Sequence, residues 1–246
     1  TPAVRRDPRP RAAVTDAVSG SATVYDAWYR TPLGAACHRI EHELVTTLAR
    51  PRAGERALDA GCGTGLYTRS LLEQGLDVTG IDADPAMLAA ARERVPAATL
   101  LEGDITALPF PDARFDLVLA VTVFCFLDHH QRATAAHELL RVLRPGGRLV
   151  IGELARTSPW ALQRRIKGWR GSRTWQRAHF STAQELEMLL RAAGADTVTT
   201  RYALYLPPVD TPLVTRHANG IERAGRRLGP LGAAFVAARA DTLHHP

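Results

Sequence analysis

The sequence has few residues of the kinds that crosslink a fold or bind metals. Only three cysteines occur in 246 residues, Cys37, Cys62 and Cys125, and they are widely spaced. This spacing is typical of neither a disulfide framework nor a zinc site. We therefore expect no metal ion, and we interpret the cysteine content as that of a protein in the reducing cytoplasm.

Long hydrophobic runs are also absent. The longest, from Leu117 to Leu127, is interrupted by Thr122 and is too short to span a bilayer. The first residues are rich in arginine and proline and lack the apolar segment of a secretory signal peptide. We therefore expect no transmembrane segment, and the hydrophobic content of 46% fits one α/β domain of ordinary size.

Lysine is nearly missing, because Lys167 is the only one and arginine supplies the rest of the positive charge. Together with the abundant alanine, this bias indicates a GC-rich genome rather than selection for arginine chemistry. We interpret the net charge of +6 as that of a solvated surface. Attraction to an anionic substrate or surface is the alternative.

The chain is predicted to form one domain, residues 21–246, after a disordered tail. Residues 1–20 contain prolines and arginines without a sustained apolar period, which is typical of disorder. Apolar residues at helical spacing between positions 24 and 48 predict one or two helices, broken at Thr31-Pro32-Leu33-Gly34.

From residue 57 onward, predicted strands and helices alternate, as in a parallel sheet covered by helices on both faces. Strands are predicted at residues 56–59, 77–82, 98–102, 115–121, 148–152, 198–205 and 233–239. Helices are predicted at residues 65–73, 85–94, 131–143 and 181–193, with a turn at residues 144–147.

The first of these strands ends in three glycines at alternate positions, 61, 63 and 65. Glycine permits a tight turn and lets a ligand approach the backbone at the start of a helix. The dinucleotide pattern G-x-G-x-x-G would need its third glycine at position 66, which is Leu66, so the spacing argues against a dehydrogenase. Asp59 would repel a pyrophosphate and attract an ammonium group. The turn therefore favours a nucleoside that carries an amino acid.

The segment Asp59-Ala60-Gly61-Cys62-Gly63-Thr64-Gly65 resembles the first motif of class I S-adenosylmethionine-dependent methyltransferases. Residues 107–116, with Leu108-Pro109-Phe110-Pro111-Asp112, and residues 139–151, with Arg144-Pro145-Gly146-Gly147, resemble later segments of the same family. The resemblance covers about residues 25–153. It is closest to the small-molecule methyltransferases of ubiquinone and menaquinone biosynthesis.

This resemblance implies a Rossmann-like α/β fold. The seven-stranded, mostly parallel sheet would have the order 3-2-1-4-5-7-6, with its last strand antiparallel and helices on both faces. Residues from about 21 to 50 would form an N-terminal helical lid. Residues from about 156 to 180 would form a basic, tryptophan-rich cover segment.

The resemblance also implies S-adenosyl-L-methionine as the cofactor, with S-adenosyl-L-homocysteine as the product. The methionine part would be surrounded by residues of the first motif, namely Asp59, Gly61, Gly63 and Gly65. Asp82, 17 positions beyond Gly65, ends the second strand and could accept hydrogen bonds from both ribose hydroxyls. The other expected cofactor contacts are Met87, Asp104 and Ile105 at the adenine, Ala120 and Val121 at the carboxypropyl arm, and Ala83 and the lid residue Tyr25.

Methyl transfer needs an aligned acceptor and a dry site, and no universal catalytic residue is expected. His129, after the fourth strand, is a candidate general base near neutral pH, although it could instead belong to a helix cap. His179 and Glu153 are the other candidates. Cys125 is interpreted as a buried structural thiol.

Residues 158–177 interleave three of the four tryptophans with basic side chains. The segment could be an interfacial helix for a lipid-like acceptor, a lid that recognises an anionic acceptor, or an ordinary cover helix.

The predicted function is methyl transfer to O, N, C or S of a small molecule. A nucleic-acid methyltransferase is the alternative within the enzyme class, but Ala120-Val121-Thr122-Val123 lacks the Asn/Asp-Pro-Pro-aromatic motif of amino-directed base methylases. A regulator that binds the cofactor without catalysis is a further alternative. The sequence leaves the acceptor and the oligomeric state open.

Overall fold

The computed structural model describes residues 22–242 of the chain. The predicted disordered tail, residues 1–20, lies outside the described residues. A seven-stranded sheet has the order β3-β2-β1-β4-β5-β7-β6. Its strands are β1 (Arg56–Ala60), β2 (Asp77–Asp82), β3 (Thr99–Glu102), β4 (Phe115–Val121), β5 (Leu143–Leu154), β6 (Thr197–Ala203) and β7 (Phe235–Asp241). The pairs among β1 to β5 are parallel and β7 is antiparallel to both neighbours, so the predicted fold class and strand order are confirmed.

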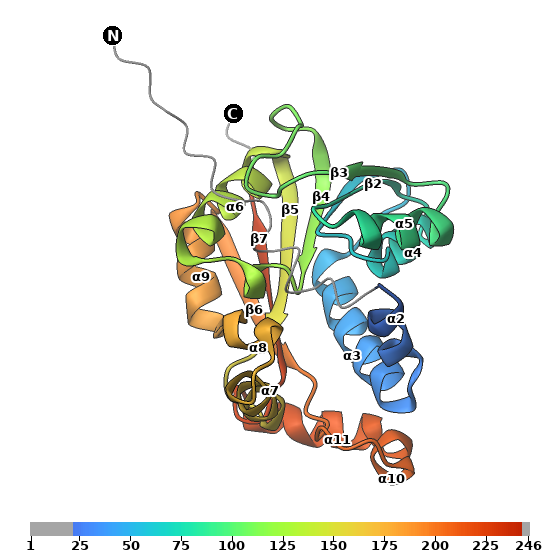
Figure 1. Cartoon of the computed structure of the whole chain (residues 1–246). Helices are drawn as coiled ribbons and strands as arrows, with labels where there is room; N and C mark the ends of the chain where they lie inside the picture. Colours follow the sequence, from blue (N-terminus) through green and yellow to red (C-terminus); the bar gives the residue numbers. More distant parts are fainter. Residues whose placement is uncertain (1–21, 243–246) are drawn as a thin grey trace.

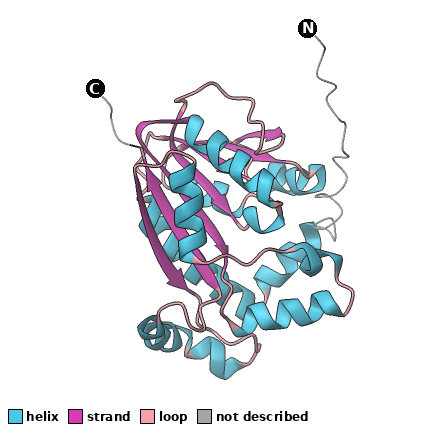
Figure 2. Ribbon diagram, turned by 90° about the vertical axis from the view of Figure 1, so that its left-hand side faces the viewer, coloured by secondary structure: helices cyan, strands magenta, loops and turns pink. Residues whose placement is uncertain are grey.

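Helices cover both faces of this sheet (Figures 1 and 2). One face carries α6 (His129–Arg141) and α9 (Ala183–Ala192), and the other carries α3 (Pro32–Ala49), α4 (Leu66–Glu73) and α5 (Pro85–Arg94). The first of the remaining α-helices packs against α3, and the others gather toward the carboxyl ends of the parallel strands, at the bottom of Figure 1. They are α2 (Ala22–Arg30), α7 (Pro159–Trp169), α8 (Arg173–Arg177), α10 (Pro212–Arg216) and α11 (Ala218–Gly225).

Side-chain caps place the starts of the helices on the α6–α9 face. Asp128 accepts a hydrogen bond from the backbone N–H of Gln131 (2.8 Å), and the backbone N–H of Asp128 donates to Oε1 of Gln131 (3.0 Å). Thr182 forms the same capping box with Glu185. A capping box satisfies two backbone donors at a helix start, so α6 begins at His129, two residues before the predicted start.

Three predicted boundaries were wrong at the β5–β7 end of the sheet. The predicted turn at residues 144–147 belongs to β5, which begins at Leu143 and shifts register against β4 between Phe115 and Leu117. Strands β6 and β7 are offset by one or two residues from their predicted positions. Helices α10 and α11 lie in a region for which the sequence predicted no element.

The buried guanidinium of Arg148 joins helix α3 to the sheet. It donates to the Glu55 carboxylate (2.9 and 2.6 Å), to the backbone oxygen of Arg50 (2.8 Å) and to that of Ala49. Arg148 is 7% exposed, so these acceptors replace the water that the guanidinium has lost. The C-terminal end of α3 is thereby fixed beside β5.

Arg148→Met should lower the free energy of unfolding by about 3–5 kcal/mol, because it leaves the Glu55 carboxylate without its buried partner. Denaturant unfolding of the purified chain measures the change. Arg191→Met is the matched control, because it removes an exposed pair with Glu187 and should cost at most about 0.5 kcal/mol. Equal effects of the two substitutions would contradict this assignment.

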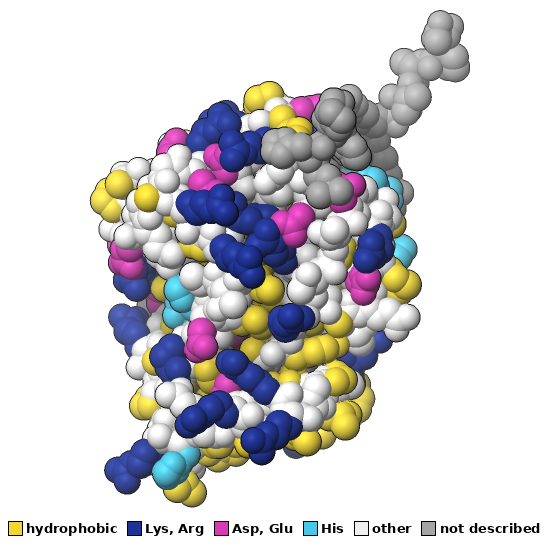
Figure 3. Space-filling model, turned by 180° about the vertical axis from the view of Figure 1, so that it is seen from behind, with side chains coloured by type: hydrophobic (Ala, Val, Ile, Leu, Met, Phe, Trp, Pro, Cys, Tyr) yellow, Lys and Arg dark blue, Asp and Glu magenta, His cyan; other side chains and the backbone are white. Residues whose placement is uncertain are grey.

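Within residues 22–242, no helix combines the length and the apolar character that crossing a bilayer requires. On the face of the molecule shown in Figure 3, lysine and arginine side chains are spread from the top to the bottom. They alternate with acidic and hydrophobic side chains and do not form one continuous basic patch on that face.

Candidate functional site

The glycine turn between β1 and α4 has a backbone that other residues adopt poorly. Gly61 and Gly63 have φ angles of +78° and +54°. A Cβ atom on Gly61 would lie 2.3 Å from Cγ2 of Val123, so the loop after β4 packs directly against the turn. A Cβ atom on Gly63 would meet nothing within 4 Å. The turn is therefore closed by protein at Gly61 and open to a ligand at Gly63.

Two carboxylates lie beside this turn. Asp59 is 2% exposed and accepts a hydrogen bond from Oγ1 of Thr68 (2.6 Å). Burial raises the pKa of Asp59 to about 6. Asp82, at the tip of β2, accepts bonds from the backbone N–H of Gly63 (2.8 Å) and of Asp84 (2.9 Å). The two acidic groups make this edge of the sheet attractive to a cation.

The end of β3 lies next to the tip of β2, because the backbone N–H of Gly103 donates to the backbone oxygen of Asp82 (3.0 Å). Asp104 is exposed, and one of its carboxylate oxygens accepts bonds from the backbone and hydroxyl of Thr106. The other predicted contacts differ in burial: Met87, Ile105, Ala120 and Val121 are buried, and Ala83 is exposed. The first three strands thus bring Asp59, Asp82 and Asp104 to one edge of the sheet.

Helix α2 is bonded across the glycine turn. Oγ1 of Thr64 donates to the Asp26 carboxylate (2.8 Å), and the Arg94 guanidinium bonds both that carboxylate and the backbone oxygen of Thr64. Tyr25, on the same helix, shares a hydrogen bond of 3.2 Å with the hydroxyl of Tyr29. Burial raises the pKa of Tyr25 to about 12. Helix α2 therefore lies over the turn, where a lid is expected.

The sequence did not indicate this latch of Asp26, Thr64 and Arg94. Thr64 lies inside the glycine motif, but its partner Asp26 is 38 positions away and Arg94 is 30 positions away. Pairs at such separations leave no local pattern, and only the packing of α2 against α5 brings them together.

A second polar group lies beneath the loop after β4. Glu153 is fully buried, burial raises its pKa to about 7, and within the described chain its Oε1 atom has no hydrogen-bond partner. The buried Arg132 side chain donates to Oγ of Ser181 (3.2 Å). Cys125 is 1% exposed, and burial raises the pKa of its thiol.

The two histidines proposed as bases lie in different surroundings. His179 is half-buried, and its backbone N–H donates to the backbone oxygen of Cys125 (2.7 Å). Its Nε2 atom lies 3.7 Å from Oε2 of Glu185, and burial lowers the pKa of the imidazole. His129 is exposed at the first turn of α6, and its side chain makes no hydrogen bond or ion pair with any described residue. The structure therefore does not bring the two imidazoles into similar positions.

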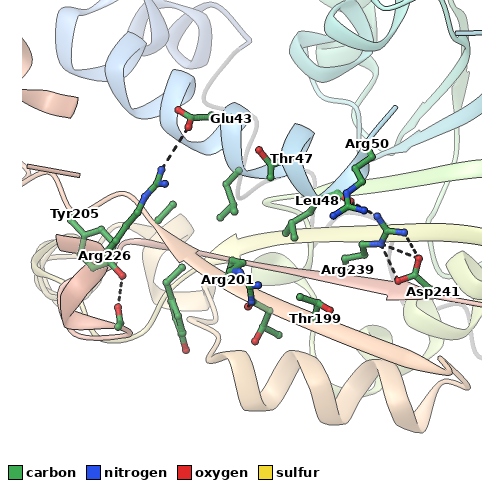
Figure 4. A pocket seen from close by; sticks show the side chains of 15 residues that line it. Glu43, Thr47, Leu48, Arg50, Thr199, Arg201, Tyr205, Arg226, Arg239 and Asp241 are labelled. Carbon is green, nitrogen blue, oxygen red and sulfur yellow. Dashed lines mark hydrogen bonds and ion pairs between the residues drawn. The ribbon is translucent and has the colours of Figure 1, made fainter. Parts of the chain in front are cut away.

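A cavity of about 690 Å³ lies elsewhere, between α3 and strands β6 and β7 (Figure 4). Arg226 reaches Glu43 and Arg239 reaches Asp241 across its wall, and Arg201 also lines it. None of the predicted site residues lines this cavity. This cavity is therefore separate from the glycine turn and its carboxylates.

Several known proteins are similar to this chain. The sequence model of a family described as a methyltransferase domain matches residues 58–151. An uncharacterized protein of Mycobacterium tuberculosis is 33% identical over 247 residues, which cover 97% of this chain and 79% of that protein. A demethylmenaquinone methyltransferase of Beutenbergia cavernae is 44% identical over 111 residues, 45% of each chain. The crystal structure of an S-adenosylmethionine-dependent methyltransferase from Thermotoga maritima, a possible histamine N-methyltransferase, has a TM-score of 0.69 at 25% identity and covers 89% of this chain and 95% of its own.

The chain belongs to the class I S-adenosylmethionine-dependent methyltransferases. Its cofactor is S-adenosylmethionine, and it resembles the quinone-type enzymes of this class. The match to the family's sequence model ends at residue 151 of this methyltransferase, before α7 begins. It contains the glycine turn, Asp82 and Asp104, but none of the helices that follow β5. The match therefore covers most of the residues predicted to contact the methyl donor.

Glu153→Gln should make the methyltransferase less sensitive to pH. The pKa of Glu153 is about 7 in the folded protein, against 4.5 for an ordinary glutamate. The folded state binds the proton of Glu153 more tightly than the unfolded state does, so protonated Glu153 stabilises the fold. This stabilisation is complete below pH 4.5 and is lost as the pH rises through 7. As the pH rises from 4.5 to 8, the wild type should lose on the order of 2–3 kcal/mol more of its free energy of unfolding than the variant does. Urea unfolding measures both proteins.

Burial lowers the pKa values of His38 and His42, so these residues make stability rise with pH. Both proteins contain them, and their effect cancels when the variant is compared with the wild type. Glu43→Gln, at an exposed position of α3, is the control and should leave the slope unchanged. A Glu153→Gln protein with the wild-type pH slope would show that Glu153 titrates normally.

Proposed function

We propose that this methyltransferase acts on a small-molecule acceptor, at O, N, C or S, by in-line displacement. The observation that carries the proposal is the bonding of α2 across the glycine turn through Asp26 and Thr64. A lid held in this way leaves the donor site enclosed, and a small acceptor fits an enclosed site better than a nucleic acid does. Enclosure also excludes water from the reacting groups.

The residues at the turn fit the proposed cofactor. S-adenosylmethionine is a cation, and Asp59 and Asp82 supply negative charge where its amino acid and ribose would lie. The open side of Gly63 leaves room for the methionine part. Beyond these three, the proposed cofactor residues are Tyr25, Gly61, Gly65, Ala83, Met87, Asp104, Ile105, Ala120 and Val121. When bound, the cofactor supplies an activated methyl group.

The chain itself has to hold the acceptor and, where needed, remove its proton. We propose His179 and His129 as the bases. The lowered pKa of His179 keeps its imidazole neutral at neutral pH, which is the state that accepts a proton. His129 lies after β4, at the edge of the sheet where ligands bind in open α/β folds. A fall in kcat for His179→Gln, with KM for the cofactor unchanged, would support the first assignment.

Calorimetric titration tests the donor side of the proposal. S-adenosylmethionine should bind the full chain and NAD should not, because the turn lacks the dinucleotide spacing. Methyl transfer to a small molecule should then follow. Salt-dependent binding and methylation of RNA or DNA would contradict the proposal. Cofactor binding without transfer to any acceptor would favour a regulator instead.

Asp82→Asn should weaken binding of S-adenosylmethionine by about tenfold, because charge-assisted hydrogen bonds to the ribose are lost. Calorimetry at constant pH and salt measures the affinity. The control is Asp77→Asn, at the exposed opposite end of β2, which should bind normally. Wild-type affinity in Asp82→Asn would show that the carboxylate does not hold the ribose.

Asp26→Asn should speed dissociation of S-adenosylhomocysteine by about tenfold, since it breaks the charged contact with Arg94 that holds α2 across the turn. Stopped-flow displacement measures the rate. Arg30→Gln changes an exposed residue at the end of the same helix and should leave the rate unaltered. An unchanged rate in Asp26→Asn would mean that α2 does not gate the site.

A further inference from the structure

Arg164, in the middle of α7, is held between two tryptophan rings. Its guanidinium carbon lies 5.4 Å from the centre of the Trp160 ring and 5.0 Å from that of Trp175, on α8. The two helices pack closely, because a Cβ atom on Gly168 would lie 3.0 Å from the backbone oxygen of Trp175. The Trp160 indole N–H in turn donates to the backbone oxygen of Leu206 (2.7 Å). The position of the guanidinium is therefore fixed by its neighbours.

Arg164 lacks acceptors of the kind that the buried Arg148 has. Within residues 22–242 it makes no hydrogen bond and no ion pair, whereas Arg148 bonds a carboxylate and three backbone oxygens. Stacking on an indole attracts the positive charge but uses none of the five N–H donors. Arg164 is half-buried, and desolvation lowers the pKa of its guanidinium. An anion placed on this guanidinium would satisfy the donors.

Arg164 lies near α2, α3 and the loop after β4. The side chains near it include Tyr29 of α2, Cys37 of α3 and Cys125 of the short 3-10 helix at Phe124–Phe126. The ring of Trp28, on α2, meets the ring of Trp160 edge to face at 6.4 Å. Arg164 therefore lies at the carboxyl edge of the sheet, where an acceptor must meet the methyl donor.

Glu41, on α3, is an acidic residue close to Arg164. Its carboxyl is buried, and it forms no ion pair with Arg164. Burial raises the pKa of Glu41 to about 7, so a large share of this group is uncharged at neutral pH. No carboxylate of the described chain therefore forms an ion pair with Arg164.

We propose that Arg164, positioned by Trp160 and Trp175, binds a carboxylate of the methyl acceptor, so that the acceptors of this enzyme are small organic anions. A planar guanidinium offers two parallel donors, which match a carboxylate. The proposal rests on the proposed function, since it places the acceptor beside the donor site. The exposed Trp169 and Leu162 of α7, which would serve a lipid surface, take no part in it.

Tryptophan fluorescence of the full chain saturated with S-adenosylhomocysteine tests this, because two tryptophans contact Arg164. The probes are benzoate, 4-hydroxybenzoate and phenylacetate, each compared with its uncharged amide. At least one carboxylate should bind about tenfold more tightly than its amide. Arg164→Gln should abolish that preference, and Arg164→Lys should keep part of it because the charge remains.

Arg170→Gln, at the exposed end of α7, is the matched control and should keep the full preference. The inference is overturned if no carboxylate is preferred over its amide in the wild type, or if Arg164→Gln retains the preference. Calorimetry with S-adenosylhomocysteine on the same samples separates the two proposals. Normal cofactor binding without carboxylate preference removes this inference alone, whereas loss of cofactor binding in the wild type contradicts the proposed function itself.

Discussion

The hydrogen bond from the backbone N–H of Gly63 to the Asp82 carboxylate holds the donor side of this enzyme together. It fixes the turn after β1 against the tip of β2, although the two residues are 19 positions apart. With the turn held there, Asp59 faces the same edge of the sheet and Thr64 meets the lid through Asp26. Loss of this bond would free the turn, and Asp59, Asp82 and helix α2 would no longer be held in fixed positions relative to one another.

The fold and the donor side could be predicted because their signals are local. Glycines at alternate positions permit a turn with positive φ, and β4, apolar except for Asp116, is buried along its whole length. The antiparallel last strand followed from the family resemblance and was confirmed. The predicted roles of the individual site residues, His129 and His179 included, stay predictions that the proposed substitutions test.

Other features could not be predicted, because they depend on contacts between distant segments. The latch between Asp26 and Arg94 joins residues 68 positions apart. The pairing of Arg164 with Trp175 requires α7 and α8 to fold back on each other, which the residue pattern alone does not dictate. The start of α6 was misplaced because the cap at Asp128 lies before the apolar period begins. The residues predicted to bind the donor therefore lie in short sequence motifs, whereas the residues proposed to bind the acceptor are brought together only by packing.

The central claim is that an enclosed donor site serves a small acceptor. The most direct test incubates the full chain with S-adenosylmethionine tritiated at the methyl group and a bacterial extract, which is then separated into small molecules, protein and nucleic acid. The account predicts that enzyme-dependent label appears in the small-molecule fraction, on an anionic compound. Label confined to nucleic acid or protein would contradict it.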